Sequence, residues 1–339
     1  MNDTIRWGIV GTGGIAHRFA QALGRVEDAT LAAVASRSKA AAERFGGEFN
    51  IPRRFASYED MAAFDGIDAA YIATPHALHT PGAILMLRHG KAVLSEKPIA
   101  VNRPELDKMI AAAHAADRLL VEAMWARMVP GTQKLLELVA QGVIGQVRGI
   151  QATFSYDMRD EPKHHAFQPQ YGGGSLLDVG CYALYFASWF AGAPVAEIRA
   201  LADVGAKTRV DEQCAILLRH ENNTLATLHS GMTCRRPSDG ALFGDEGYIT
   251  MARFYAPERF TLHRYDREQP EEFETPYIGN GFEEQIIAFN RCLREGRKES
   301  DLLPLAQSRE IARQMDEIRR QVGVVYPQDG GEDDCASEE

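Results

Sequence analysis

Short, continuously apolar segments alternate with amphipathic ones over the first 122 residues. The apolar segments are Ile5–Val10, Thr30–Ala35, Ala69–Ala73, Ala92–Leu94 and Leu119–Glu122. Helical periodicity fills stretches between them that end at Arg25, Phe45, His89 and Ala116. Continuously apolar strands are typical of a parallel sheet covered by helices on both faces. Regular alternation of strands with helices indicates βαβ units. The pattern therefore predicts a doubly wound α/β domain with a parallel sheet.

A different pattern begins after Met124. Helices are expected at 130–141 and 175–190, with a long alternating strand at 147–158 between them. Shorter strands at close spacing and two last helices are then expected at 197–204, 213–219, 225–232, 248–251, 260–264, 282–295 and 305–322. Consecutive strands joined by short turns favour an antiparallel sheet. This half of the chain is predicted to be an α+β domain.

The two patterns place the first domain over 1–124 and the second over 125–323, with a large, mostly antiparallel sheet in the second domain. The last helix, 305–322, could pack back on the first domain. Residues 324–339 contain six of the 47 acidic residues and no Lys or Arg. This acidic, apolar-poor end predicts a disordered tail.

Composition narrows the possible functions. The chain has 339 residues, 45% of them hydrophobic and 25% charged, which is typical of a soluble protein with two cores. No segment approaches the roughly 20 apolar residues that a membrane span needs. Met1–Ile9 lacks the apolar core of a signal peptide, so we expect a cytoplasmic protein without membrane partners. The net charge of -10 argues against nucleic acid as a partner.

The cysteines do not suggest a disulfide framework or a zinc site, because the five are widely spaced and none forms a CxxC pair. There is also no HExxH motif and no carboxylate-rich loop, so no metal is predicted.

A glycine-rich turn directly follows the first predicted strand. It reads Gly11-Thr12-Gly13-Gly14-Ile15-Ala16 and matches G-x-G-x-x-(G/A). In such a turn the glycines allow tight bending and close approach to a pyrophosphate, which lies at the helix N-terminus. The motif's position in a βαβ run favours a Rossmann dinucleotide-binding domain over a purely structural turn.

The end of the second strand favours NADP over NAD. An acidic residue there would bind the ribose 2′-hydroxyl and repel a 2′-phosphate. Here the strand runs into Ser36, Arg37 and Ser38, and no acid occurs before Glu43. Arg37 can pair with a 2′-phosphate and the serines can donate hydrogen bonds to it. The alternative is that Ser38 only caps the next helix and Arg37 is solvated, which would leave NAD or dual use.

Three further motifs carry a family resemblance. They are Ala73-Thr74-Pro75-His76 with His79, Glu96-Lys97-Pro98, and Gly172-Gly173-Gly174-Ser175-Leu176-Leu177-Asp178-Val179-Gly180-Cys181-Tyr182. Together with the glycine turn, they resemble the glucose–fructose oxidoreductase, inositol dehydrogenase and rhizopine-catabolism family (Gfo/Idh/MocA). The chain is most similar to its dimeric dihydrodiol dehydrogenase and NADP-linked D-xylose dehydrogenase branch. Inositol dehydrogenases have His in place of Tyr182, which puts an inositol substrate in doubt.

Alcohol oxidation needs a hydride acceptor, which the nicotinamide cofactor provides, and a base for the hydroxyl proton, which a side chain must provide. Asp178 and Tyr182 are spaced i, i+4 and would share a helix face. A phenol titrates near 10, so a Tyr base needs a nearby cation, for which Lys97 is the candidate. We expect Tyr182 to act as general acid/base, Lys97 as its electrostatic partner and Asp178 as a substrate ligand. Core packing of Tyr182 and helix-dipole stabilisation by Asp178 are the structural alternatives.

The remaining candidates surround these three. Glu96 is expected to orient Lys97, and the resemblance implies that Thr74, Pro75, His76 and His79 lie near the nicotinamide, where the histidines could equally be structural. Trp125, Arg127, Phe154 and Arg159 could line a sugar or diol pocket, because aromatic rings pack on sugar C–H faces.

The hypothesis is an NADP(H)-dependent oxidoreductase acting on a secondary alcohol or carbonyl of a sugar or trans-dihydrodiol, with ketosugar reduction equally compatible. The alternatives are a glycosidase that keeps NAD bound and uses transient oxidation, an NAD-linked polyol or inositol dehydrogenase, and a non-catalytic dinucleotide sensor. The resemblance also implies a homodimer formed through the open sheet face of the second domain.

Overall fold

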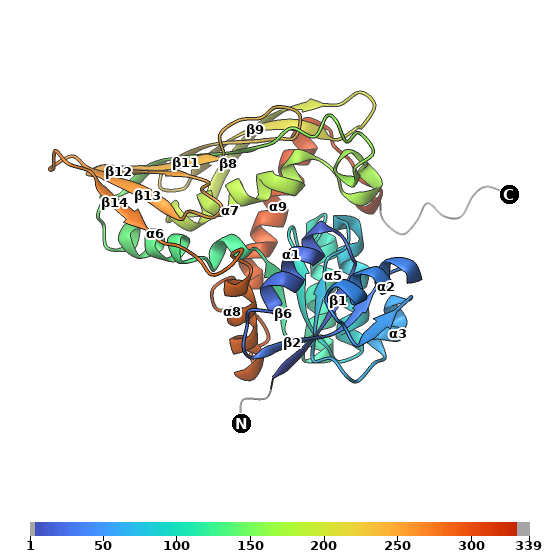
Figure 1. The fold of residues 1–339 in the computed structure, drawn as a ribbon. Coiled ribbons are helices and arrows are strands. Elements are labelled where there is room, and N and C mark those ends of the chain that lie inside the picture. Colours follow the sequence, from blue (N-terminus) through green and yellow to red (C-terminus); the bar gives the residue numbers. More distant parts are fainter. Residues whose placement is uncertain (1–3, 331–339) are drawn as a thin grey trace. The chain divides into compact units, whose positions relative to one another are not determined.

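The computed structural model describes residues 4–330, and the chain divides into two compact units (Figure 1). Unit 1 consists of Met1–Met128 and Tyr277–Glu310, and unit 2 of Val129–Pro276 and Ile311–Glu339. The sequence patterns place the change of domain near residue 124 and assign 277–310 to the second domain. The structure differs because residues 277–310 share a core with the first sheet.

Unit 1 is built on a six-stranded parallel sheet in the order β3-β2-β1-β4-β5-β6. Its strands are β1 (Ile5–Val10), β2 (Ala29–Ala35), β3 (Arg53–Phe55), β4 (Ala69–Ile72), β5 (Ala92–Glu96) and β6 (Leu120–Ala123). Its helices are α1 (Gly14–Leu23), α2 (Lys39–Glu48), α3 (Tyr58–Ala62), α4 (His79–Arg88), α5 (Arg103–Ala116) and α8 (Glu283–Arg294). The predicted doubly wound sheet is confirmed.

The strand order reverses direction at β1, which pairs with β2 on one side and β4 on the other. Trp7, Ile9 and Val10 of this central strand are fully buried. In open α/β sheets, ligands bind at the carboxyl ends of the strands where the order reverses. The glycine turn that follows β1 lies at that point.

Helix α8 joins unit 1 through polar as well as apolar contacts. Asn290 accepts a hydrogen bond from the indole N–H of Trp7 at 3.3 Å, and Trp7 packs against Phe289 with ring centroids 4.8 Å apart. The buried carboxylate of Glu283 pairs with Arg25 at 3.1 Å. These partners are more than 250 residues apart in sequence, so periodicity alone could not assign α8 to this unit.

Unit 2 contains an eight-stranded sheet in the order β14-β13-β12-β11-β7-β10-β9-β8. Its strands are β7 (Val147–Ser155), β8 (Val195–Val204), β9 (Asp211–His220), β10 (Leu225–Gly231), β11 (Asp239–Gly244), β12 (Gly247–Ala252), β13 (Arg259–Arg264) and β14 (Glu271–Glu274). Neighbouring strands are antiparallel except for β7 and β10, which are parallel. The prediction of a large, mostly antiparallel sheet is confirmed.

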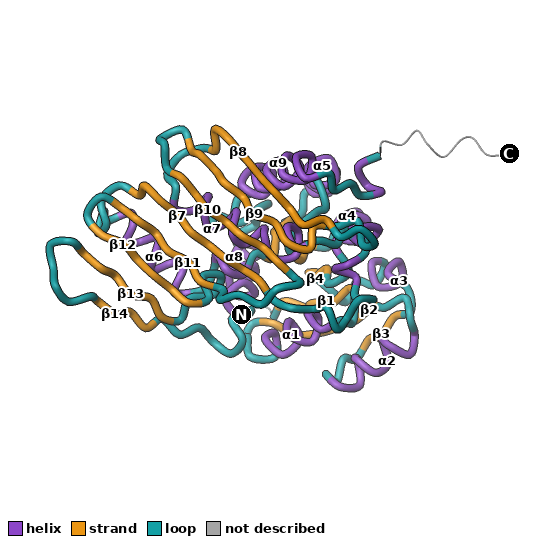
Figure 2. The backbone as a smooth tube through the Cα atoms, turned by 90° about the horizontal axis from the view of Figure 1, so that it is seen from above, coloured by secondary structure: helices purple, strands orange, loops and turns teal. Residues whose placement is uncertain are grey.

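One face of this sheet carries helices α6 (Pro130–Ala140) and α7 (Cys181–Phe190) (Figures 1 and 2). The opposite face exposes large apolar side chains: Leu201 is 81% exposed, Leu225 57% and Leu217 56%. Exposed leucines along neighbouring strands form the kind of surface that associates with a partner.

Four short elements were not predicted: β3, α3, β11 and β14. β3 is the three-residue segment Arg-Arg-Phe, and β14 reads Glu-Glu-Phe-Glu, so neither has an apolar run. β11 begins and ends close to glycines, which weaken a strand signal. Sheet pairing, rather than intrinsic propensity, forms these strands.

Helix α9 (Leu305–Val322) contributes its first six residues to unit 1 and the remainder to unit 2. Within unit 1, Arg309 forms a bidentate pair with Asp107 of α5 at 2.6 and 3.0 Å. The chain then continues into residues 324–330, which differ from the predicted disordered tail because Val324 and Tyr326 are buried in unit 2. The rest of that predicted tail, 331–339, lies outside the described residues. Among residues 4–330, no helix has the length and apolar character needed to span a membrane.

Candidate active site

The turn after β1 presents open backbone N–H groups. Gly11 has φ +109°, and a Cβ there would lie 2.7 Å from the carbonyl oxygen of Ala73, so only glycine fits. At Gly13 and Gly14 a Cβ would meet no atom within 4 Å, and no side chain caps the start of α1. Thr12 and Ile15 of the same turn are partly exposed. An uncapped helix N-terminus with open space before it fits a pyrophosphate.

The loop after β4 lies beside this turn. Thr74 Oγ1 is buried and makes no hydrogen bond with the described residues, which suits a ligand that supplies the missing partner. His79 is fully buried, with its ring nitrogens 2.9 Å from the carbonyl oxygens of Thr74 and Pro98. His76 is 7% exposed, and its ring centroid lies 5.6 Å from that of His79. His79 thus ties together the loops that follow β4 and β5.

The loop after β2 contains Ser36, Arg37 and Ser38, the residues expected to bind the 2′-phosphate on the cofactor ribose. Ser38 Oγ accepts a hydrogen bond from the backbone N–H of Ala41 and caps α2. This is the capping role that the sequence offered as the alternative to cofactor binding. Ser36 Oγ accepts from the N–H of Ser38 at 3.3 Å. Arg37 is exposed and interacts with the phenol of Tyr58, where burial raises the pKa of Tyr58 and Arg37 opposes the rise. The loop therefore presents a cation and no carboxylate.

Two buried carboxylates fix the backbone around Lys97. Glu96 is 4% exposed, accepts a hydrogen bond from the hydroxyl of Tyr71 and accepts another from the N–H of Lys97 at 3.2 Å. Burial raises the pKa of Glu96, and the charge of Lys97 counteracts the rise. Glu122 of β6 accepts from the N–H of Ile99 at 3.2 Å. The sequence indicated Glu96 as an orienting neighbour but gave no reason to select Glu122.

Trp125 and Arg127 follow β6 within unit 1. Trp125 is 3% exposed, and its ring lies 5.2 Å from that of Phe282, while the guanidinium of Arg18 lies 5.6 Å from the indole. Burial lowers the pKa of Arg127, and Asp301 opposes that shift. Trp125 is therefore held in the core of unit 1 by residues that come from both segments of that unit.

In unit 2, the glycine run 172–174 leads into the helical segment 176–190, which carries the predicted site residues Asp178 and Tyr182 and is named the reactive helix after that prediction. Gly173 lies so close to the neighbouring loop that a Cβ would be 2.5 Å from the carbonyl oxygen of Ala166. Gly174 has φ +117°, and a Cβ there would be 2.2 Å from Asp211 Oδ1. Asp211 Oδ2 accepts hydrogen bonds from the hydroxyl of Ser175 at 2.8 Å and the N–H of Leu176 at 2.6 Å. Gly173 thus allows the close approach of the neighbouring loop, and Gly174 makes room for the buried carboxylate of Asp211, which caps the helix.

The helix begins with a wide turn over Leu176–Gly180, in which the N–H of Cys181 bonds to the carbonyl of Leu176 five residues back. Such turns are rare and occur often at functional sites. Asp178 lies in this turn and is the one residue between 172 and 187 that is not buried. The hydroxyl of Tyr156 donates a hydrogen bond to Asp178 Oδ2. The wide turn therefore presents a carboxylate at an otherwise buried segment.

Tyr182 lies in the first turn of α7 and is the neighbour of two other aromatic rings. Its ring centroid lies 5.5 Å from that of Phe154 on β7 and 5.8 Å from that of Tyr255. Phe154 and Tyr255 are stacked at 4.2 Å with an interplanar angle of 5°. The sequence suggested Phe154 as a pocket-lining residue but did not suggest Tyr255. Tyr255 lies on the loop between β12 and β13, and the position of this loop depends on sheet packing. Arg159 is exposed and pairs with Asp157 at 2.7 Å.

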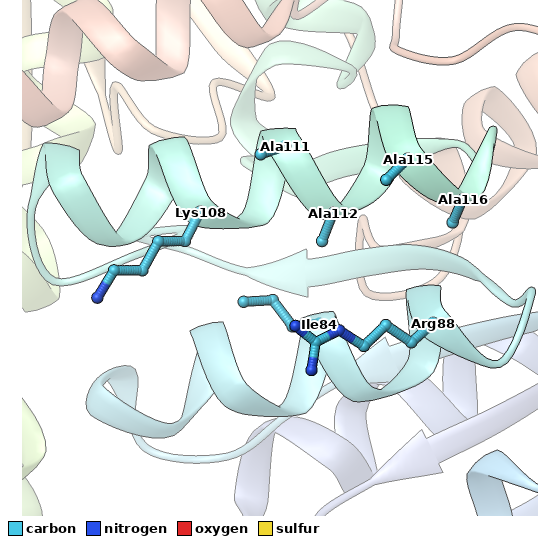
Figure 3. A pocket seen from close by; sticks show the side chains of 7 residues that line it. All are labelled: Ile84, Arg88, Lys108, Ala111, Ala112, Ala115 and Ala116. Atoms are coloured by element: carbon cyan, nitrogen blue, oxygen red, sulfur yellow. The ribbon is translucent and has the colours of Figure 1, made fainter.

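A separate groove of about 580 Å³ lies between α4 and α5 (Figure 3). Four alanines of α5, together with Ile84, Arg88 and Lys108, line it. It contains none of the predicted site residues, so its volume alone does not make it the active site. Among residues 4–330, no group of three or more His, Cys, Asp or Glu side chains is arranged to hold a metal ion.

A doubly wound parallel sheet with an open phosphate turn at its switch point defines a dinucleotide-binding protein. Residues 5–123 match the model of an oxidoreductase family with an NAD-binding Rossmann fold, and residues 132–250 match a GFO/IDH/MocA C-terminal domain. The chain belongs to the Gfo/Idh/MocA oxidoreductase family, as the sequence motifs predicted.

Its relatives include trans-1,2-dihydrobenzene-1,2-diol dehydrogenases. The mouse protein is 34% identical over 96% of this chain and 99% of its own length, and the human protein is 31% identical over 96% and 99%. A 3-ketoreductase from Actinomadura kijaniata, solved with NADP and TDP-benzene, is 27% identical with a TM-score of 0.86 and covers 94% of this chain and 98% of its own. The protein is thus an NAD(P)-dependent dehydrogenase or reductase. A Caulobacter crescentus aldose-aldose oxidoreductase, 23% identical, has a TM-score of 0.86 over 94% of this chain and 98% of its own and shares the fold.

Proposed function

We propose that the protein is an NADP(H)-dependent oxidoreductase that transfers a hydride between the nicotinamide and a secondary alcohol or carbonyl of a sugar or trans-dihydrodiol. The observation that carries this proposal is the start of the reactive helix. There the Asp178 carboxylate is partly exposed, and Tyr182, four residues further on, packs against the ring of Phe154. Polar groups at an aromatic surface suit a ligand with both hydroxyls and C–H faces. The relatives named as trans-1,2-dihydrobenzene-1,2-diol dehydrogenases support a diol substrate, and the neighbour named as a 3-ketoreductase supports carbonyl reduction.

The roles follow from the chemistry of each side chain. The nicotinamide, when bound, supplies the hydride acceptor or donor. Tyr182 is proposed to take the hydroxyl proton during oxidation and to return it during reduction. The backbone N–H of Lys97 donates a hydrogen bond to the carboxylate of Glu96. The charged side chain of Lys97 would stabilise the phenolate form of Tyr182. Asp178 would accept a hydrogen bond from a substrate hydroxyl and fix its orientation.

The preference for NADP rests on the loop after β2. Arg37 is exposed there and Ser36 lies beside it, while no acidic residue occurs before Glu43. An arginine can form two charge-assisted hydrogen bonds with a 2′-phosphate. A neutral ribose hydroxyl does not offer this bidentate, charged interaction. Thr12 to Ile15 are proposed to hold the pyrophosphate, with Thr74, Pro75 and His76 toward the nicotinamide.

The open face of the unit 2 sheet is proposed to form a homodimer. Leu201, Leu217 and Leu225 come from three neighbouring strands and are all more than half exposed. Arg199 and Arg219 both pair with Glu197 among them, which gives the face polar as well as apolar groups. A mixed surface of this kind is typical of an interface between copies of one chain.

The test is an absorbance screen at the NADPH band, with sugars and trans-diols as substrates and both cofactors in parallel. The expected result is substrate-dependent reduction of NADP⁺, or oxidation of NADPH by a ketosugar, with a higher kcat/KM for NADP(H) than for NAD(H). Release of sugar from a glycoside by the purified protein, with no net change in cofactor redox state, would refute the proposal and favour a glycosidase.

A further inference from the structure

Tyr156 connects the reactive turn to the central strands of the unit 2 sheet. It directly follows β7, and its backbone N–H donates to the carbonyl of Gly231 on β10 at 3.0 Å. The next residue, Asp157, forms an antiparallel bridge with Thr233. The backbone of Tyr156 is therefore fixed by two strands, and its hydroxyl donates to Asp178 Oδ2.

The proton of this hydrogen bond belongs to Tyr156. Burial raises the pKa of Tyr156 far above its ordinary value, and the charge of Asp178 raises it further. Tyr156 therefore remains a neutral phenol and a donor across the pH range in which the protein would work. Tyr156 is therefore unsuited to act as a base.

Asp178 needs support from outside its own segment. It lies in the wide turn Leu176–Gly180, where the N–H of Cys181 bonds to the carbonyl of Leu176 five residues back, and its side chain is partly exposed. A binding group must be held within about 0.5 Å of its productive position by its neighbours. The Tyr156 hydroxyl supplies such a hold from a different element.

We propose that Tyr156 is a positioning residue, which holds the Asp178 carboxylate in place and keeps it ionised as an acceptor for a substrate hydroxyl. This inference rests on the proposed role of Asp178 as a substrate ligand. Tyr156 acts on the reaction through Asp178 alone, so its contribution disappears when the carboxylate is absent.

The experiment is a double-mutant cycle with Tyr156→Phe, Asp178→Asn and the double variant. Tyr156→Phe keeps the ring and removes only the hydroxyl. A lost hydrogen bond to a charged group predicts a roughly ten- to hundredfold lower kcat/KM, with an unchanged Kd for NADP⁺. Asp178→Asn is expected to lose at least as much. The double variant should match Asp178→Asn within about twofold, because two residues that act as a unit are not additive.

The pH profile separates positioning from a general loss of packing. Loss of a hydrogen-bond donor to a carboxylate disfavours the ionised form, so the acid limb of kcat/KM is expected to move to higher pH in Tyr156→Phe. Tyr171→Phe, which removes a phenol elsewhere in unit 2, is the matched control and should leave the limb in place. Thermal midpoints of all variants show that each is folded.

Each other outcome is decisive. Wild-type kcat/KM in Tyr156→Phe, or fully multiplicative losses in the double variant, would overturn the positioning role while leaving the proposed function intact. Wild-type kcat/KM in Asp178→Asn would instead overturn the proposed role of Asp178 itself.

Discussion

Asp211 is predicted to make the stability of unit 2 depend on pH in an unusual direction. It begins β9 and is fully buried. Its Oδ2 accepts from Ser175 and Leu176, whereas Oδ1 has no hydrogen-bond partner among the described residues. Burial raises the pKa of Asp211 to about 6, although the two hydrogen bonds and the charge of Arg319 oppose the rise.

The size of the effect follows from the two states of the chain. An aspartate carboxyl in water ordinarily has a pKa of 3.8, whereas the pKa of Asp211 is about 6 in the folded chain. At 1.36 kcal/mol per pKa unit, that difference corresponds to about 3 kcal/mol. The folded chain binds the proton more tightly than the unfolded chain does. The free energy of unfolding therefore falls as pH rises between about 4 and 6. Above about pH 6 the whole stabilisation of about 3 kcal/mol from protonated Asp211 is lost.

Asp211→Asn removes the titration while keeping one acceptor oxygen for Ser175 and Leu176. We expect the variant to gain stability relative to the wild type, by about 3 kcal/mol, as pH is raised from 4 to 8. Urea unfolding at closely spaced pH values, followed by tryptophan fluorescence, measures this difference. Asp239→Asn, at the exposed start of β11, is the control for removal of a carboxylate. A difference between wild type and Asp211→Asn that stays constant from pH 4 to 8 would refute the reasoning.

Four further outcomes are expected. Arg37→Asp should weaken NADP⁺ binding at least tenfold and leave NAD⁺ binding unchanged or tighter, as measured by fluorescence titration; an unchanged ratio would exclude Arg37 from the phosphate site. Tyr182→Phe should lower kcat by about 10²-fold or more without changing the Kd for NADP⁺, the scale of lost acid/base catalysis. If the proposed homodimer forms through the open sheet face, Leu201→Asp combined with Leu217→Asp should convert it to a monomer in sedimentation velocity, and a variant that still sediments as a dimer would place the interface elsewhere. Gly174→Ala should destabilise unit 2 by about 1–3 kcal/mol, because its φ of +117° is unfavourable for alanine.

The fold could be predicted because its signals are local. The apolar run of β1 is followed at once by the glycine turn, and strand–helix alternation continues to β6. The short strands β3 and β14 escaped because neither has an apolar run, and both are held by pairing with the neighbouring strands β2 and β13. Helix α8 was recognised as a helix but not as part of unit 1, since its partner Trp7 lies 283 residues away.

In the candidate site, too, residues in contiguous motifs could be predicted from the sequence, whereas residues positioned by the fold could not. The residues proposed to carry the chemistry, such as Lys97, Asp178 and Tyr182, could be selected from the sequence because they belong to contiguous motifs. The sequence missed the residues that hold them, such as Glu122 and Tyr156, because a carboxylate or phenol on a strand has no signal until the chain folds. Tyr255 belongs with the missed residues, since the loop after β12 reaches Phe154 only through sheet packing.

The sequence by itself determined the βαβ order, the phosphate turn and the residue types of the reactive helix, because spacing along the chain is enough to specify each. Only the tertiary structure decided which buried groups support them. Asp211 caps the reactive helix from 36 positions away, and Tyr156 reaches Asp178 from the end of a strand. Burial also decided the charge states, because desolvation depends on what surrounds a carboxylate and not on its neighbours in sequence.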